Sequence, residues 1–529
     1  MSTRILFTGG LLVDGTGAPA RPADVLVDGS LIAQVTEPGR LRDDGATSRE
    51  LGGAVLCPGF IDVHSHADNA PLLAEDDQSK ITQGVTTEVV GNCGFSLAPI
   101  DDSHREALRG LMGRIFPPVD APWSSLAELF EATDAAGYVT NYAPLVGHHA
   151  LRVAAMGMAD GAPDDQQLAA MRYSAEEAFG AGAFGLSSGL IYPPGLFAED
   201  GEIHALAKTL PPGSPYVTHM RGEGRMLLDS VAEAIRVGEV SGRPVQVSHL
   251  KAAGRAVWGR MGEVLQLLDD ARAGGVDVTH DVYPYLAGST MLTATLPPWF
   301  QEGGNPALLR RLGDPAALSQ LRRDIESDDG TWENHVAACG WAGIVVASSR
   351  SHEYDGRSLQ QIADGMGVEP FQALVDVLRG EELEASMIVF SMREEDLVEA
   401  LLHPFTMIGS DGLPPGGGGR PHPRMWGTFP RVLSRYVRET GVLTLEEAIR
   451  KMTSLPARRF GLDARGEVRP GAIADLVVLD PGTVHDQADY DDPIRPAVGI
   501  LDVLVGGRLV VDGGTYVGER AGARLVPSR

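Results

Sequence analysis

The sequence predicts an α/β protein built around a parallel (β/α)8 barrel, with a smaller β domain beside it. Two observations support this prediction. Short apolar runs alternate with helical stretches through the middle of the chain, whereas the two ends contain only short strands and tight turns. Alternation of strand and helix implies βα units and a parallel sheet. At 529 residues a closed barrel is the favoured form, and a doubly wound open sheet is the competing arrangement.

The two ends of the chain are predicted to build one small β-sandwich domain together. Residues 1–56 contain ILFTGGLLVDG, and residues 466–529 repeat the same pattern in VGILDVLVGGRLVVDGG. Gly-Gly and Asp-Gly pairs at these places are typical of β-hairpin turns. Because the segments TGGLLVDG and VGGRLVVDGG are so alike, we expect both ends to contribute strands to the same domain.

The barrel is expected over residues 57–465. Apolar runs such as CPGFIDVH and GVTTEVVGN predict buried strands, and stretches such as DQQLAAMRYSAEEAFGAG and MGEVLQLLDDARAGG predict helices. Residues from about 287 to 347 interrupt the alternation with LPPWFQEGG and the charged RRDIESDDG. We expect this stretch to be an insertion that covers part of the active site.

Charge and cysteine content narrow the class of protein. Lys and Arg number 44 against 71 Asp and Glu, and the net charge of −27 opposes binding to nucleic acid or to anionic membranes, which need a basic face. The three cysteines are too few for a disulfide scaffold and fit a reducing cytosol. The start lacks the features of a signal peptide, and no run approaches the length of a membrane helix. We expect a soluble, cytoplasmic protein that acts on a small molecule, with its oligomeric state open.

A pair of histidines marks the end of the first predicted barrel strand. His64 and His66 lie two residues apart in DVHSH, so on a strand both side chains point to the same face and can reach one metal ion. Taken alone, such a pair is as often structural as functional. Its position at the end of the apolar run 59–63 favours function, because barrel enzymes collect their catalytic residues at that face.

Other metal-binding and acidic side chains occupy the same kind of position. A lone cysteine is more often a small buried apolar residue, and a lone histidine is more often a hydrogen-bonded imidazole. Six such groups, all at strand ends, are hard to attribute to chance. A thiolate and several imidazoles favour one or two Zn²⁺ ions over oxygen-seeking cations, with a carboxylate as general base on metal-activated water. The strand-end groups are His64, His66, Cys93, His219, His249 and, as the base, Asp411.

These residues lie in motifs that resemble the amidohydrolase superfamily and, within it, the D-aminoacylases, over essentially the whole chain. The histidine pair and the strand-end His and Asp residues mark the superfamily, whereas GNCGFS and HPRMWGTF are the specific part of the resemblance. The resemblance implies zinc-dependent hydrolysis of N-acyl-D-amino acids, which gives a D-amino acid and a carboxylate.

The resemblance also assigns roles to individual residues. It implies that Cys93, His219 and His249 hold a tight Zn²⁺, that His64 and His66 form a weaker second site, and that Asp411 is the catalytic aspartate. The cysteine stands where many relatives use a carboxylated lysine or a glutamate. Lys251, Tyr283 and Ser289 match positions that line the substrate site. The glycine-rich run 414–420 departs from the family pattern beside the substrate, which leaves the shape of the mouth open.

The substrate carboxylate can be assigned a partner from charge. A protein with a net charge of −27 needs a local cation to bind an anion, and Arg424 follows Asp411 with a planar fork that fits a carboxylate. The alternative is that Arg424 makes an internal ion pair.

Three functions compete on the sequence alone. The first is the deacylase reaction, the second is another amidohydrolase reaction such as cyclic amide or D-dipeptide hydrolysis, and the third is a non-enzymatic role for the same scaffold. A cyclic amidase is expected to show a bridging lysine rather than Cys93, and a non-enzymatic relative is expected to lose some of the ligands. The preferred side chain, the acyl group and the number of metal ions stay open.

Overall fold

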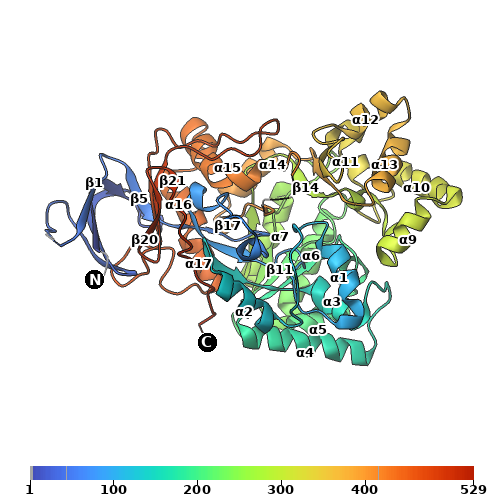
Figure 1. The fold of residues 1–529 in the computed structure, drawn as a ribbon, viewed down its shortest axis with the longest axis horizontal. Helices are drawn as coiled ribbons and strands as arrows, with labels where there is room; N and C mark the ends of the chain where they lie inside the picture. Colours follow the sequence, from blue (N-terminus) through green and yellow to red (C-terminus); the bar gives the residue numbers. More distant parts are fainter. Residues whose placement is uncertain (1–3, 43–44, 415, 417, 529) are drawn as a thin grey trace.

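A closed barrel of parallel strands forms the centre of the molecule, as predicted (Figure 1). The computed structural model describes residues 4–42, 45–414, 416 and 418–528. Only Leu145 separates β8 from β9, and its N–H donates to Val90 of the neighbouring strand, so β8 and β9 form one barrel strand. The barrel strands are β6 (Phe60–Asp62), β7 (Val85–Val90), β8 (Asn141–Pro144) with β9 (Val146–Gly147), β10 (Leu186–Gly189), β11 (Tyr216–His219), β12 (Val245–Val247), β13 (Val278–Val282) and β17 (Thr406–Ile408).

The first and last barrel strands close the barrel just beyond their ends. Ser65 and Gly412 form a parallel bridge, and the N–H of Asp411 donates to the carbonyl of His64 at 2.7 Å. The segment that carries the histidine pair therefore lies directly beside the segment that carries Asp411.

Helices that follow the strands surround the barrel. The predicted helices at 165–182 and 261–275 are present as α4 (Asp165–Ala181) and α7 (Met261–Ala273). A capping box between Asp164 and Gln167 starts α4 and satisfies its first free N–H groups. The other helices outside the insertion are α1 (Arg105–Met112), α2 (Leu126–Ala136), α3 (His148–Met156), α5 (Asp200–Ala207), α6 (Leu227–Ser241), α14 (Glu394–Leu402), α15 (Arg424–Arg431), the π-helix Val432–Glu439, α16 (Leu445–Met452), α17 (Ser454–Phe460) and the short 3₁₀ helices Ala70–Leu72, Ile81–Gln83, Asp102–His104 and Gly195–Phe197.

The small β domain contains strands from both ends of the chain. β18 lies between β19 and β5 and pairs antiparallel with both, so the N-terminal and C-terminal strands share one nine-stranded sheet. Gly506 and Gly507 form the two-residue turn between β19 and β20 with φ of 54° and 76°, which a hairpin turn of this kind requires and glycine adopts without strain. The strands are β1 (Arg4–Leu12), β2 (Arg21–Asp28), β3 (Leu31–Thr36), β4 (Thr47–Glu50), β5 (Val55–Pro58), β18 (Leu476–Leu479), β19 (Ile500–Val505), β20 (Arg508–Asp512) and β21 (Thr515–Tyr516).

The small domain continues directly into the barrel. Only Gly59 separates β5 from β6, and its N–H donates to the carbonyl of Asp475, just before β18, at 2.8 Å. In Figure 1 the blue N-terminal strands lie beside the dark red C-terminal strands at one end of the molecule.

A separate unit lies between β13 and β17. It contains an antiparallel sheet in the order β14-β16-β15 and several helices, and α9 to α13 project at the end of the molecule opposite the small domain (Figure 1). The sheet continues to Val389, past residue 347 where the sequence pattern placed the end of the insertion. The elements are β14 (Gly288–Met291), a 3₁₀ helix (Leu292–Thr295), α8 (Pro298–Gln301), α9 (Gly304–Arg311), α10 (Pro315–Ser327), α11 (His335–Cys339), a 3₁₀ helix (Trp341–Gly343), β15 (Ile344–Ser349), α12 (Leu359–Met366), α13 (Pro370–Gly380) and β16 (Ala385–Val389).

Within the described ranges, every helix is too short or too polar to cross a bilayer.

Candidate active site

The predicted metal-binding residues converge at the carboxyl ends of the barrel strands, where barrel enzymes place their chemistry. His64 and His66 follow β6, Cys93 follows β7, His219 ends β11 and His249 follows β12. All five side chains are buried. The structure thus brings together groups that lie up to 185 positions apart in the numbered chain.

Three site residues adopt a backbone conformation that is uncommon outside glycine. Cys93 has φ of 53°, His249 of 36° and Asp411 of 51°. Such left-handed conformations carry a cost in residues with a side chain, and they persist where the surrounding structure holds them. Each marks the point where the chain leaves its strand and turns a side chain toward the site.

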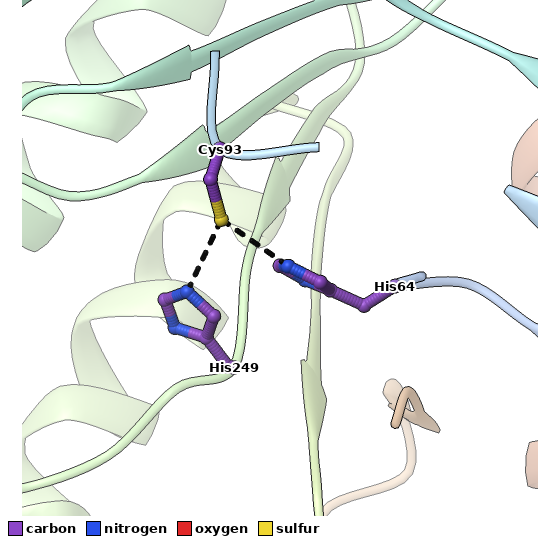
Figure 2. A group of neighbouring side chains, drawn as sticks. All are labelled: His64, Cys93 and His249. Carbon is purple, nitrogen blue, oxygen red and sulfur yellow. Dashed lines mark hydrogen bonds between the residues drawn. The ribbon is translucent and has the colours of Figure 1, made fainter. Parts of the chain in front are cut away.

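Cys93 lies against two imidazoles (Figure 2). Its Sγ is 3.2 Å from Nε2 of His64 and 3.6 Å from Nε2 of His249. Burial raises the pKa of the Cys93 thiol, and the neighbouring His64 opposes this only in part. A bound cation would therefore be needed to hold the thiolate at neutral pH, which is the form that binds zinc.

A second group of candidate ligands shares His249. Nδ1 of His249 is 3.0 Å from Oε1 of Glu223, and Nε2 of His219 is 4.0 Å from Oε2 of the same carboxylate. Both ring nitrogens of His219 are buried without a hydrogen-bond partner among the described residues, which is unusual for a buried polar group and fits a metal ligand. Burial lowers the pKa of His219 and His249 well below the usual range, so both are neutral and able to act as ligands.

The ligand set implied by the resemblance is divided between these two groups. Cys93 is grouped with His64 and His249, whereas His219 is grouped with Glu223 and His249. His249 is common to both groups, so Cys93 and His219 both lie beside the same imidazole.

Asp411 forms a third group with the histidine pair. Its Oδ1 lies 3.2 Å from Nε2 of His66 and 3.6 Å from Nε2 of His64. Its Oδ2 lies 2.8 Å from Nη1 of Arg424. Burial alone would raise the pKa of Asp411, but Arg424 and His64 hold it well below its usual range. The carboxylate is therefore ionised at neutral pH.

Two aspartates that the sequence analysis did not single out hold these residues in place. Oδ1 of Asp281 accepts the backbone N–H of His249 at 2.8 Å and lies 3.4 Å from Nδ1 of His64. Asp62 accepts the N–H and the hydroxyl of Ser410, next to Asp411, at 2.8 and 2.5 Å. Asp62 ends β6 and Asp281 is the last residue but one of β13, so a positional signal close to that of the metal-binding candidates could have found them.

Glu223 is a further residue that the sequence analysis missed. Its Oε1 is 2.5 Å from Nζ of Lys251, and Lys251 Nζ is 2.8 Å from Nδ1 of His249. Burial alone would lower the pKa of Lys251, but Glu223 raises it above its usual value. Glu333, from the insertion, accepts the backbone N–H groups of Glu223 and Gly224 at 2.9 and 3.0 Å. The only signal in the sequence was the position of Glu223 four residues after His219.

One cavity connects the candidate metal ligands with the predicted substrate residues. Arg424 lies with its Cζ 4.8 Å from the centre of the Tyr283 ring, and its Nη2 donates to the backbone carbonyl of Ser289 at 3.1 Å. Arg424 thus makes the internal ion pair with Asp411 and also lines the cavity. The lining includes His66, Cys93, His219, His249, Lys251, Tyr283, Ser289, Asp411 and Arg424, all of them predicted, together with Glu223 and the insertion residue His335.

The glycine-rich run is only partly described. Gly416 and Gly418 line a second cavity that adjoins the first, whereas Pro415 and Gly417 lie outside the described residues. The effect of this run on the mouth stays a prediction.

Comparison with known proteins gives a consistent result. The model of the amidohydrolase family matches residues 49–511. The chain is 38% identical to a D-aminoacylase from Alcaligenes xylosoxydans xylosoxydans over 98% of this chain and 97% of that protein. It is 37% identical to an N-acyl-D-glutamate deacylase from the same organism, over 95% and 92% of the two chains.

Solved structures agree with the sequence matches. A D-aminoacylase structure superimposes with a TM-score of 0.82 at 36% identity, over 99% of both chains. An N-acyl-D-glutamate deacylase from Bordetella bronchiseptica, complexed with zinc and a phosphonate inhibitor, also gives a TM-score of 0.82, at 34% identity over 100% of both chains. These matches confirm the predicted fold class, a barrel with a β-sandwich from the termini. The chain belongs to the D-aminoacylase family of metal-dependent amidohydrolases.

Proposed function

We propose that this protein hydrolyses the amide bond of N-acyl-D-amino acids and releases a D-amino acid and a carboxylate. The observation that carries the proposal is one cavity that joins a cysteine and histidine donor set to an ionised aspartate and to the cations Lys251 and Arg424. Relatives that are a D-aminoacylase, an N-acyl-D-glutamate deacylase and an N-acyl-D-aspartate deacylase support the substrate class and its D configuration.

Zinc is the metal that the donors fit best. Cys93, His219 and His249 would hold the tight ion, and His64 and His66 would form a weaker second site. A soft thiolate with neutral imidazoles is the donor set that zinc prefers over calcium or magnesium. The unpartnered ring nitrogens of His219 support this assignment. When bound, zinc supplies Lewis acidity, which polarises a carbonyl and lowers the pKa of water.

Asp411 would act first as the general base and then as the general acid. Because its pKa lies well below the usual range, it starts ionised and can accept a proton from the attacking water. The same proton then passes to the leaving amine. His66 and Arg424 contact the two carboxylate oxygens and hold the side chain toward the cavity.

Arg424 would bind the α-carboxylate of the substrate, with Lys251, Tyr283 and Ser289 beside it. The contact between Nη1 and Asp411 is short, but it lacks hydrogen-bond geometry, so the N–H groups of Nη1 have no hydrogen-bond acceptor in the part of the chain that the structure describes. A substrate carboxylate could accept them. Lys251, whose pKa is raised, is a second cation on the same cavity wall.

The test is an amine-release assay on matched N-acyl-D and N-acyl-L amino acids, with zinc measured on the same sample. Release from the D series, proportional to bound zinc and lost after chelation, is the expected result. Cyclic amides and D-dipeptides belong in the same panel. Faster turnover of either class, with no release from N-acyl-D-amino acids, would show another amidohydrolase reaction and contradict the proposal.

A further inference from the structure

Arg114 is a third cation on the wall of the active-site cavity. It follows the end of α1 and lines both the active-site cavity and the second cavity that adjoins it. Neither the sequence motifs nor the proposed mechanism gives this side chain a role.

The partners of Arg114 are all neutral within the described part of the chain. Its Nη1 lies 3.3 Å from the hydroxyl of Thr293 and 3.8 Å from the sulfur of Met291, and its Nη2 contacts the amide oxygen of Asn305. Its Nε is buried and has no hydrogen-bond partner among the residues that the structure describes. Burial lowers the pKa of Arg114 to about 10, still far above neutral pH, so the side chain keeps its charge.

The other cations of the cavity differ from Arg114 because each faces a carboxylate. Lys251 contacts Glu223, and Arg424 contacts Asp411. Arg114 is half-buried, and even partial withdrawal of a charge from water without a counter-ion is costly. A ligand that brings its own carboxylate to Arg114 would supply that partner.

We propose that Arg114 binds a second carboxylate of the substrate, so that the enzyme prefers dianionic N-acyl-D-amino acids. This inference rests on the proposed function and names its substrate class. One carboxylate is the α-carboxylate at Arg424, and the other belongs either to an acidic D side chain or to a dicarboxylic acyl group. A local excess of cations would also help to attract a dianion to a protein with a net charge of −27.

The competing feature of the cavity is its apolar wall. Phe95, Ile191 and Met291 line it together with Arg114. If these side chains governed specificity, apolar D side chains would be preferred and Arg114 would have no effect on the choice of substrate.

The wild-type enzyme gives the first test. N-acetyl-D-glutamate is compared with N-acetyl-D-glutamine, and N-succinyl-D-leucine with its succinamic amide, so that each pair differs only in one carboxylate. A kcat/KM ratio of roughly 10 to 100 in favour of the acid is expected for one pair, because a charge-assisted hydrogen bond has that effect. A high ratio in the first pair places the carboxylate on the side chain, and a high ratio in the second places it on the acyl group.

Variants test whether Arg114 is responsible. In Arg114→Met the ratio of the preferred pair should fall to near one, and Arg114→Lys, which keeps the charge, should retain part of it. Arg109→Met, at an exposed arginine within α1, should leave the ratio as in the wild type. Bound zinc and the unfolding midpoint of each variant show whether it is folded.

Two results would overturn the inference. In the first, the wild type gives kcat/KM ratios near one in both pairs and turns over the neutral substrates well. This result would show that the enzyme does not recognise a second carboxylate, and it would leave the proposed function intact. In the second, Arg114→Met and Arg114→Lys both keep the wild-type ratio, which would show that another residue recognises the second carboxylate. Absence of turnover on every D substrate would instead contradict the proposed function itself.

Discussion

Replacing Arg424 with alanine separates two effects of one guanidinium group. In the structure Nη1 lies 2.8 Å from Oδ2 of Asp411, and Nη2 donates to the carbonyl of Ser289 at 3.1 Å. If Arg424 also binds the α-carboxylate, the variant loses a contact with the substrate. At the same time it leaves Asp411 without the cation that contacts its Oδ2.

Loss of the substrate contact changes kcat/KM, whereas loss of the cation beside Asp411 changes the pKa of that carboxylate. A charge-assisted hydrogen bond contributes about 1.5–3 kcal/mol, so kcat/KM on a free acid should fall roughly 10- to 100-fold. Lysine at this position should not restore it, because a point charge lacks the planar fork. Burial raises the pKa of Asp411, and Arg424 is the main group that lowers it, so removal of Arg424 moves this pKa upward. A base is active above its pKa, so the acid limb of the pH profile should move to higher pH.

The assay compares an N-acyl-D-amino acid with its carboxamide across the acid limb of the profile, for the wild type and Arg424→Ala. The carboxamide should be a poor substrate of the wild type by a similar factor, and the two losses should not add, because each removes the same contact. If Arg424→Ala lost as much activity on the carboxamide as on the free acid, Arg424 would act only through its contact with Asp411 and would not bind the substrate carboxylate. A shift of the acid limb without selective loss on the free acid would lead to the same conclusion.

Three further variants test the site and the fold. Cys93→Ala should lose bound zinc and activity while its circular dichroism spectrum is unchanged. A variant with the wild-type zinc content and turnover would show that Cys93 is a packing residue and not a ligand. Asp411→Asn should keep its zinc and lose roughly 10² to 10⁴ in kcat, the usual share of general acid–base catalysis, whereas an unchanged kcat would exclude it as the base. Lys80→Met should lower the free energy of unfolding in urea by about 3–5 kcal/mol, because the buried Glu88 carboxylate loses a cation at 3.2 Å. The exposed Lys208→Met is the control, and equal stability of the two variants would contradict a structural role for Lys80.

The barrel and the convergence of the candidate metal ligands could be predicted because both signals are local. A buried strand is recognised in the sequence as an apolar run. In a parallel barrel, a residue at the carboxyl end of such a run lies at the catalytic face, and this position does not depend on the other segments. The positions of Cys93 and His249 at the ends of their own apolar runs are enough to place both at one site, although 156 positions separate them. The signal for the helix Asp165–Ala181 is equally local, because the residues of its N-terminal cap and its apolar spacing lie within or next to the segment.

Other features depend on contacts between distant segments and have no local signal. Glu223 lies in a loop, and its contact with Lys251 exists only because β11 and β12 are neighbours in the barrel. The insertion was hard to delimit for a related reason. Its later part, from β15 to β16, again alternates strand and helix, which is also the pattern of the barrel. Only the antiparallel pairing of β15 with β16 distinguishes the two.

The junction between the small domain and the barrel has a consequence for the order of synthesis. β5 pairs with β18, and one residue after β5 the chain enters the strand that leads to His64. During translation, β1 is already available to pair with β5, but β18 is absent until residues 476–479 have emerged from the ribosome, after all the barrel strands have been made. The segment that carries the histidine pair therefore completes its contacts, with Asp411 directly and with β18 through β5, only after residues 476–479 have been made.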